Sequence, residues 1–233
     1  MKEAGAAALG AAPAQATPSK KEARPNAGNP GEPGRGGSAG KRKLSARFIM
    51  SAVRPGQFPP EGLPEIAFLG RSNVGKSSLL NTLTGVKGLA HTSSTPGRTQ
   101  AINFFQVQDK WCFVDLPGYG YARVPRDLKD SWKHLIESYL VRRAPLALCC
   151  LLLDARRGWM DMDLELREWL QGQGLRCMVI ATKTDKLKNQ KEQRASLSAL
   201  HAHLGDAELV LFSAVTGQGV REIWQAISKT HKM

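Results

Sequence analysis

A glycine-framed motif between an apolar strand pattern and a helical pattern constrains this chain more than any other feature. Eight consecutive residues match G-x-x-x-x-G-K-[ST], namely Gly70, Arg71, Ser72, Asn73, Val74, Gly75, Lys76 and Ser77. The apolar run 65–70 before the motif predicts a strand, and the apolar spacing over 76–83 predicts a helix. The sequence therefore places a tight glycine-rich turn between a strand and a helix.

The residue types in this turn suit a phosphate group. Gly70 and Gly75 allow the backbone to curl so that successive N–H groups face one anion, and the following helix adds the positive end of its dipole. Lys76 can reach the β- and γ-phosphates of a nucleoside triphosphate, and the Ser77 hydroxyl can bind Mg²⁺. The motif in this context predicts a P-loop.

The order of the other patterns predicts the fold class. Strand patterns cover 47–53, 65–70, 101–107, 111–114, 146–153, 177–181 and 209–212. Helical patterns cover 76–83, 128–141, 162–170, 187–204 and 220–231. Strands that alternate with helices predict an α/β fold with a mostly parallel central sheet and helices on both faces. The two strands on either side of the polar residues 108–110 predict a hairpin.

Residues 1–45 differ in composition from the rest of the chain. Ala, Gly and Pro account for 24 of these 45 residues, and apolar side chains larger than Ala are nearly absent. Such a stretch cannot bury enough surface to offset its ordering entropy. We therefore expect a disordered basic tail followed by one folded domain over 46–233. A mitochondrial transit peptide is the alternative, but the scattered Glu3, Glu22 and Glu32 argue against it.

The charge and apolar content limit the partners and the location. Lys and Arg number 33 against 20 Asp and Glu, a net charge of +13, which favours a polyanionic partner, nucleic acid before anionic membrane. The longest apolar run, 144–153, is too short for a membrane span, which needs about 20 residues. No signal-peptide pattern is present, and the four cysteines lack C-x-x-C spacing, which is typical of free thiols in a reducing cytosol. We expect a cytoplasmic protein.

Two segments after predicted strands indicate which base is bound. The first, after 177–181, consists of Thr182, Lys183, Thr184 and Asp185. The Asp185 carboxylate can accept both the N1–H and the N2 amino hydrogens of guanine, whereas adenine has neither donor, and such pairing discriminates by roughly 10⁴ to 10⁵. Lys183 can lay its methylenes along the base. The second segment, Phe212, Ser213 and Ala214, can bring a backbone N–H to guanine O6. An ATPase with the same P-loop is the alternative, and Asp185 argues against it.

Two further segments predict switch loops. Asp115, Leu116, Pro117 and Gly118 follow the strand 111–114. Asp115 can hold Mg²⁺ through water, and the Gly118 N–H can contact the γ-phosphate, so that loss of this phosphate would release the loop. In the loop 85–100, Thr92, Thr95 and Thr99 can each supply a hydroxyl to Mg²⁺, and their spacing does not choose among them.

Several of these motifs together resemble those of a known family. The segments GRSNVGKSSLLNTL, TPGRTQAINFF, DLPGYGYA, TKTD and FSA are similar to those of the EngB/YihA-type GTPases of the TrmE–Era–EngA–EngB group. The resemblance runs from about residue 48 to the C-terminus. It implies a single Ras-like domain that binds GTP with Mg²⁺, hydrolyses it and acts in assembly of the large ribosomal subunit, with a link to normal cell division and septation.

The resemblance also implies roles for individual residues. The Mg²⁺ ligands fall on Ser77 and Thr99, and the nucleotide site gains Gly97, Arg98, Thr99, Gln100 and Ala101. The residues expected to act in hydrolysis are Lys76, Thr99 and Gly118.

One position departs from Ras-type chemistry. Tyr119 follows Gly118 where Ras has the glutamine that orients water, and the family shares this substitution, so we expect slow intrinsic hydrolysis. The side-chain carbonyl of Asn73 can ligate K⁺ near the phosphates, as similar asparagines do in related GTPases. The alternative is that Asn73 only braces the P-loop by hydrogen bonding.

Basic residues outside the P-loop point to a partner. They are Arg142, Arg143, Arg156, Arg157, Lys183, Lys186, Lys188, Lys191 and Arg194. Because no base-reading motif is present, the sequence favours structured rRNA, bound through its backbone and shape. The resemblance implies that this rRNA belongs to the precursor of the large ribosomal subunit, and we expect a monomer. The alternative is a protein–protein switch, in which 91–100 and 117–127 dock a division or envelope protein and the charge serves solubility.

Overall fold

The computed structural model describes residues 44–90, 101–119 and 126–232, without the side chains of 126–133 and 232. The chain divides into two units, 1–40 and 41–233, and the fold below is that of the second. The predicted tail over 1–45 lies outside the described residues except for its last two positions. Thr92, Thr95 and the predicted site residues Gly97 to Gln100 also lie outside them.

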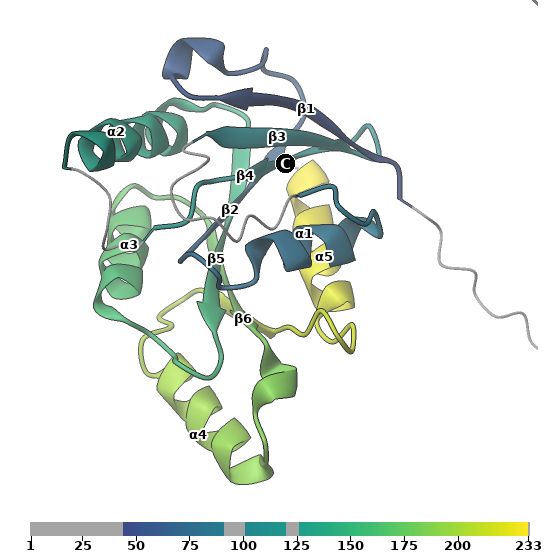
Figure 1. Ribbon diagram of the computed structural model, residues 1–233, viewed down its shortest axis with the longest axis vertical. Coiled ribbons are helices and arrows are strands. Elements are labelled where there is room, and N and C mark those ends of the chain that lie inside the picture. The colour runs from purple at the N-terminus through teal and green to yellow at the C-terminus, as the bar shows by residue number, and fades with distance from the viewer. Residues whose placement is uncertain (1–43, 91–100, 120–125, 233) are drawn as a thin grey trace, which may run out of the picture. The chain divides into compact units, whose positions relative to one another are not determined.

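A seven-stranded sheet forms the centre of the described unit (Figure 1). Its strands are β1 (Ala46–Ala52), β2 (Glu65–Gly70), β3 (Ile102–Val107), β4 (Trp111–Asp115), β5 (Leu146–Asp154), β6 (Cys177–Thr182) and β7 (Glu208–Leu211). They lie in the order β1-β3-β4-β2-β5-β6-β7. Strand β2 pairs in parallel with β4 and β5, and β5, β6 and β7 continue the parallel part. The pairs β1–β3 and β3–β4 are antiparallel. The mostly parallel α/β sheet was predicted from the sequence.

Five α-helices cover the two faces of the sheet. They are α1 (Lys76–Thr84), α2 (Arg126–Arg142), α3 (Asp161–Gly172), α4 (Gln190–His201) and α5 (Val220–Lys229). Leu79 of α1 and Ile223 of α5 are buried in one core cluster. Tyr139 of α2, Leu170 of α3 and Leu200 of α4 are buried in the other. Figure 1 shows α1 and α5 together on one side of the strands and α2 and α3 on the other.

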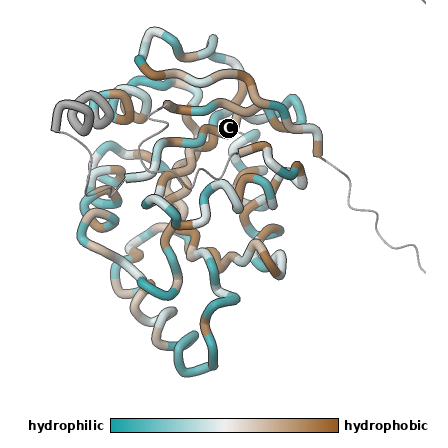
Figure 2. Tube along the Cα trace, viewed as in Figure 1, coloured by the Kyte–Doolittle hydropathy of each residue, from teal (hydrophilic) through white to brown (hydrophobic). Residues whose placement is uncertain are grey.

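The central strands are apolar on both faces because helices cover both. All six residues of β2 are buried, as are the last seven of β5. Figure 2 shows hydrophobic residues along these inner strands and hydrophilic residues over much of α4. The predicted hairpin joins β3 to β4 through residues 108–110. Gln108 and Asp109 are both at positive φ, in a turn where the Lys110 N–H donates to the Val107 carbonyl at 3.1 Å.

The helix predicted over 187–204 is shorter than expected. Residues Thr184–Lys186 form a short 3-10 turn, and the chain is extended at Leu187. The α-helix begins after Asn189, whose side chain accepts a hydrogen bond from the Glu192 N–H at 2.9 Å. This N-cap sets the start of α4, because it satisfies a backbone donor that the first turn leaves without a partner.

The four cysteines lie in strands β4, β5 and β6 and are free thiols. Burial raises the pKa of Cys112 to about 12 and the pKa of Cys177 to about 11, so both thiols are uncharged near neutral pH. In the part of the chain that the structure describes, no helix combines the length and apolar character that a membrane crossing needs.

Candidate functional site

Four loops meet at the carboxyl edge of the sheet. The P-loop leaves β2, the segment Asp115 to Gly118 leaves β4, Thr182 to Asp185 leaves β6, and Phe212 to Ala214 follows β7. Because β2, β4, β5, β6 and β7 run parallel, their carboxyl ends lie along one edge. Open α/β sheets bind their ligands at this edge. The structure thus brings together the predicted segments from distant parts of the chain.

The P-loop has the tight geometry that its glycines predict. Gly75 has a φ of +112° and immediately precedes α1. A Cβ atom at Gly70 would lie 2.9 Å from Val74 Cγ1 and 3.0 Å from Leu152. Asn73 also has a positive φ, of 62°, and Val74 is buried beneath the turn. The backbone therefore curls closely against β5, and only glycine fits at Gly70 without displacing its neighbours.

Lys76 and Asp115 form an ion pair across the site. Lys76 opens α1 and Asp115 ends β4, and each side chain is 12% exposed. Both groups therefore lie where the P-loop contacts the segment Asp115 to Gly118. An ammonium and a carboxylate in this position suit a phosphate and a divalent cation respectively, because each can exchange its present partner for an oppositely charged ligand.

The segment after β4 lies along the P-loop. The Ser72 N–H donates to the Tyr119 carbonyl at 3.1 Å, and the Tyr119 N–H donates to the Gly70 carbonyl at 3.3 Å. A Cβ atom at Gly118 would lie 2.9 Å from Ser72 Oγ, so this position also has room only for glycine. Leu116 is buried, with its N–H bonded to the Phe68 carbonyl at 3.1 Å.

The Lys183 loop is bonded directly to the P-loop. The Thr182 hydroxyl donates to the Val74 carbonyl at 2.6 Å, and Lys183 Nζ donates to the Asn73 carbonyl at 2.6 Å. A Cβ atom at Gly75 would lie 3.7 Å from Lys183 Cε, so the lysine methylenes pass beside the turn. These bonds fix the predicted base-binding loop relative to the predicted phosphate-binding loop.

Asp185 is positioned by the loop that follows β7. The Ser213 hydroxyl donates to Asp185 Oδ1 at 2.7 Å, and the Thr184 N–H donates to the Phe212 carbonyl at 3.3 Å. The Asp185 side chain is 15% exposed, while Ala214 is exposed beside it. One carboxylate oxygen of Asp185 thus has a fixed partner, and the group stands at an accessible edge where a base can reach it.

Comparison with known proteins places this site in a family. A family model described as 50S ribosome-binding GTPase matches residues 65–183. A probable GTP-binding protein EngB from Solibacter usitatus is 58% identical over 187 residues, which cover 80% of this chain and 96% of the relative. Another from Desulforamulus reducens is 47% identical over 189 residues, covering 80% and 92%. The chain belongs to the EngB family of GTP-binding proteins.

Solved structures agree with this assignment. The crystal structure of a probable GTP-binding protein EngB has a TM-score of 0.57 and 26% identity, covering 72% of this chain and 98% of that one. Era in complex with MgGDPNP and nucleotides 1506–1542 of 16S ribosomal RNA has a TM-score of 0.58 and 24% identity, covering 73% and 57%. The Era comparison shows the shared fold. This EngB-family protein is a P-loop GTPase that binds and hydrolyses GTP.

Asp154 is a site residue that the sequence analysis did not identify. It ends β5, and Oδ2 accepts from Lys183 Nζ at 3.0 Å and from Arg156 at 2.6 Å. Burial acts to raise the pKa of this carboxyl, but the hydrogen bonds from Arg156 and Lys183 outweigh it and hold the pKa well below its usual range. The sequence could have indicated Asp154 through its position at the carboxyl end of an apolar strand, because the other site loops begin at equivalent positions.

Tyr119 is held by a carboxylate of α3. Its hydroxyl donates to Asp163 Oδ1 at 2.7 Å, and Asp163 is only 2% exposed. Burial, followed by the charge of Asp163, raises the pKa of Tyr119 far above its usual range, so the phenol stays a neutral donor. In this EngB-family structure the residue at the Ras glutamine position is therefore bonded to a helix rather than free to orient water.

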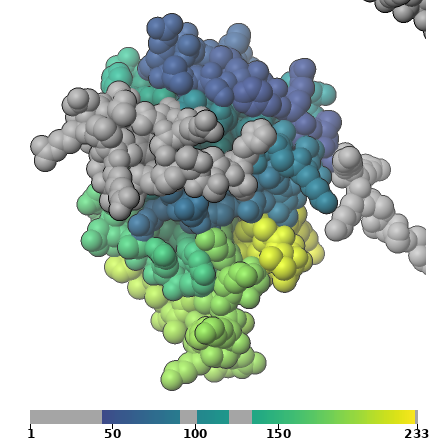
Figure 3. All heavy atoms as spheres, in the orientation of Figure 1, coloured from purple at the N-terminus to yellow at the C-terminus, as the bar shows by residue number. Residues whose placement is uncertain are grey.

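The basic surface predicted from the sequence needs correction. Arg143 is buried, and its guanidinium donates to Glu65 at 2.6 Å and 3.0 Å, so it belongs to the interior of the fold. Arg156 and Lys183 are paired with Asp154. The exposed basic residues that remain are Arg142, Arg157, Lys186, Lys188, Lys191 and Arg194. Figure 3 shows the α4 region, in light green, at the lower end of the visible face.

The remaining predicted site residues have different outcomes. Ser77 lies in the first turn of α1, and Ala101 is buried just before β3. Pro117 is buried between Leu116 and Gly118. Gly97, Arg98, Thr99 and Gln100 lie outside the described residues, so their roles stay predictions. A hydroxyl at Ser77 and a carboxylate at Asp115 are both oxygen ligands beside the P-loop, and this donor set fits Mg²⁺.

Proposed function

We propose that this protein is a GTP-controlled switch that acts in assembly of the large ribosomal subunit and is needed for normal cell division and septation. The observation that carries the proposal is the direct bonding between the P-loop and the segment Asp115 to Tyr119. A γ-phosphate entering beside Lys76 changes the partners of that segment, so the nucleotide state determines its conformation.

Each group in the site has a specific task in this proposal. Lys76 neutralises the β- and γ-phosphates, the Gly118 N–H contacts the γ-phosphate, and Asp185 accepts the two guanine hydrogens. The backbone of residues 70–77 surrounds the phosphates, and the Ala214 N–H donates to guanine O6. Lys183, held at the Asn73 carbonyl, supports the base with its methylenes.

Mg²⁺ fits the same arrangement. We place its protein ligands at the hydroxyls of Ser77 and Thr99, with Asp115 acting through water. When bound, the cation supplies neutralisation of charge on the β- and γ-oxygens. Asp115, now paired with Lys76, would hold the cation through water, and Lys76 would then be available to the phosphates. Segment 97–101, including Thr99, completes this site.

Intrinsic hydrolysis is slow in this proposal because Tyr119 cannot replace the Ras glutamine. Its hydroxyl is committed to Asp163, and among the described residues the exposed Asn73 side chain makes no hydrogen bond that would brace the loop. The side-chain carbonyl of Asn73 can then ligate K⁺ near the phosphates. GTP turnover measured in K⁺ and in Na⁺ at equal ionic strength tests this role, which predicts faster turnover in K⁺; equal rates would remove the cation.

The partner is the precursor of the large ribosomal subunit, bound through rRNA in the cytoplasm by a monomer. The family description and the exposed basic residues beyond Asp185 support this choice. Co-sedimentation of the purified protein with large subunits, loaded with a non-hydrolysable GTP analogue or with GDP, tests the switch. We expect binding in the GTP-like state and release with GDP. Equal binding in both states would contradict it.

A protein–protein switch in cell division is the second candidate. The segment Asp115 to Tyr119 is consistent with this candidate, because a loop whose conformation depends on the nucleotide can bind a protein as well as RNA. Salt dependence separates the two candidates. Binding to rRNA weakens steeply between 50 and 200 mM salt, on the order of 10³-fold for six phosphate contacts. A mainly apolar protein interface does not show this dependence.

A further inference from the structure

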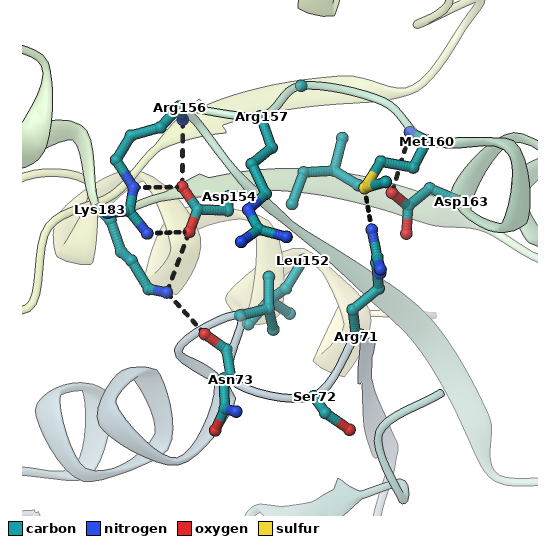
Figure 4. Close-up of a pocket in the computed structure, with 13 residues that line it drawn as sticks. Arg71, Ser72, Asn73, Leu152, Asp154, Arg156, Arg157, Met160, Asp163 and Lys183 are labelled. Atoms are coloured by element: carbon teal, nitrogen blue, oxygen red, sulfur yellow. Dashed lines mark hydrogen bonds and ion pairs between the residues drawn. The ribbon is translucent and has the colours of Figure 1, made fainter. Parts of the chain in front are cut away.

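A second pocket lies beside the P-loop, against the loop that joins β5 to α3. Its volume is about 290 Å³, and its walls include Arg71, Asn73, Asp154, Arg157 and Asp163. Figure 4 shows Arg71 extending from the P-loop and Arg157 extending from the opposite loop into the space between them. Asp185 and Ser213, which mark the predicted base site, do not line it. The pocket therefore does not include Asp185 or the loop after β7, although Lys183 of the loop after β6 forms part of its wall.

The two carboxylates in this pocket already have partners. Asp154 accepts hydrogen bonds from Arg156 at 2.8 Å and from Lys183 at 3.0 Å. Asp163 accepts from the Tyr119 hydroxyl at 2.7 Å and from the Met160 N–H at 3.1 Å. All four oxygens thus have hydrogen-bond partners, of which those of Asp154 are cationic and those of Asp163 are neutral.

Two guanidinium groups remain without a carboxylate partner. Within the described residues, Arg157 forms no ion pair. The Arg71 guanidinium donates a hydrogen bond to the thioether sulfur of Met160, and its charge acts on Asp163 without a direct ion pair. Counting Arg156 and Lys183, four cationic groups line the pocket against two carboxylates, which leaves two positive charges. A guanidinium prefers a planar, bidentate anionic partner, and a thioether is a weak acceptor. The pocket is therefore built to receive an anion.

The walls of the pocket connect an anion to the switch. Arg71 belongs to the P-loop, and its backbone pairs with Tyr119 as an isolated parallel bridge. Asp163 holds the Tyr119 hydroxyl. A ligand that draws Arg71 away from Met160 therefore acts on the strand-like pairing between the P-loop and the segment Asp115 to Tyr119, where we expect the γ-phosphate to act from the other side.

We propose that this pocket binds a backbone phosphate of RNA and so couples RNA contact to the nucleotide state; this rests on the proposed ribosomal function. A polymer with repeated phosphates is favoured over an acidic peptide because further exposed cations follow in the neighbouring segment. Lys188, Lys191 and Arg194 are exposed beyond Lys183, which itself lines the pocket. Repeated cations on adjacent elements match a repeated anion.

The test uses the full-length protein, purified large ribosomal subunits and a non-hydrolysable GTP analogue. Arg157→Gln removes the exposed pocket cation that forms no ion pair among the described residues. Arg221→Gln removes an exposed arginine of α5, on the opposite face of the sheet from α3. We expect Arg157→Gln to weaken subunit binding about tenfold at low salt. It should also reduce the slope of log affinity against log salt by about 1. Arg221→Gln should match the wild type, and guanine nucleotide affinity should be unchanged in both variants.

Three results would overturn the proposal. If the wild type binds subunits and Arg157→Gln binds with the same affinity and salt slope, the pocket does not contact RNA, while the proposed ribosomal function stands. If a polyglutamate peptide displaces the wild type from subunits at charge concentrations where a short RNA of mixed sequence does not, the pocket recognises an acidic protein. Absence of subunit binding by the wild type would remove the ribosomal function itself, and the phosphate site with it.

Discussion

Asp154 shows how one carboxylate can connect two loops of a nucleotide site. It binds Lys183 Nζ at 3.0 Å, and the same ammonium binds the Asn73 carbonyl at 2.6 Å. The P-loop and the base-binding loop are therefore joined through a charge-assisted pair that is mostly shielded from water. Such hydrogen bonds are shorter and stronger than neutral ones.

Asp154→Asn should weaken GDP and GTP binding alike. The amide keeps the shape of the side chain but loses the charge that holds Lys183, so we expect an affinity loss of about tenfold or more for both nucleotides. Calorimetric titration with each nucleotide measures this. Arg156→Gln is the matched control, because it removes the exposed partner of Asp154 and leaves the contact with Lys183 in place. An Asp154→Asn protein with wild-type affinity would contradict the role.

The same substitution should change how stability depends on pH. The pKa of Asp154 is lowered in the folded state, so its charge stabilises the fold above the unfolded-state pKa of about 3.9. This contribution is lost as the pH falls through the folded-state value. The difference in melting temperature between wild type and Asp154→Asn should therefore shrink below about pH 4. A melting-temperature difference that grows on acidification would contradict a stabilising role of the Asp154 charge.

A second residue, Asp185, determines the preference for guanine. In Asp185→Asn the acceptor for the guanine N1–H is replaced in part by an amide donor, so GTP affinity should fall and xanthine nucleotides should gain. We expect the preference between GDP and xanthosine diphosphate to shift by at least about a hundredfold towards xanthine. Competition against a fluorescent nucleotide measures the ratio. Unchanged guanine preference would place base recognition elsewhere.

At the scale of elements, a buried charged cluster fixes α2 to the sheet. Glu65 begins β2, and its carboxylate accepts from Arg143 at 2.6 Å and from the Tyr139 hydroxyl at 2.8 Å. All three residues are buried. The end of α2 is therefore held beside the first residue of the strand that leads into the P-loop, so that packing far from the site supports the start of the motif.

Replacing Arg143 by Met should destabilise the fold strongly. The substitution leaves the Glu65 carboxylate buried without its cation, which costs about 3–5 kcal/mol of unfolding free energy. Urea unfolding followed by circular dichroism measures the loss. Arg142→Met is the matched control, since Arg142 is the exposed neighbour at the end of the same helix and should change stability by less than about 0.5 kcal/mol. Equal effects of the two substitutions would contradict the buried pair.

For the described unit as a whole, local pattern was sufficient to predict the architecture. Strand β2 matches its apolar run 65–70, and α1 follows the P-loop motif directly. The meeting of the four loops also followed from the sequence, because the carboxyl ends of parallel strands share an edge. The start of α4 was less predictable, since a cap at Asn189 competes with the apolar pattern that extends before it.

Contacts between distant charged residues could not be predicted from the sequence. Arg143 was counted with the basic surface because its partner Glu65 lies 78 positions away. Asp154 and Asp163 each looked like ordinary acidic residues until their partners Lys183 and Tyr119 were placed beside them. A spacing pattern reports which residues share an element, and the pairing of side chains between elements depends on the three-dimensional fold.

The proposed function depends on one site in which a curled P-loop holds phosphates while Asp185 selects guanine. Isothermal titration of the full-length protein with GDP, GTP and ATP, in the presence of Mg²⁺, tests it most directly. We predict saturable binding of both guanine nucleotides and no measurable heat of binding with ATP at the same concentrations. Binding of ATP as tight as that of GTP would contradict the selection of guanine by Asp185.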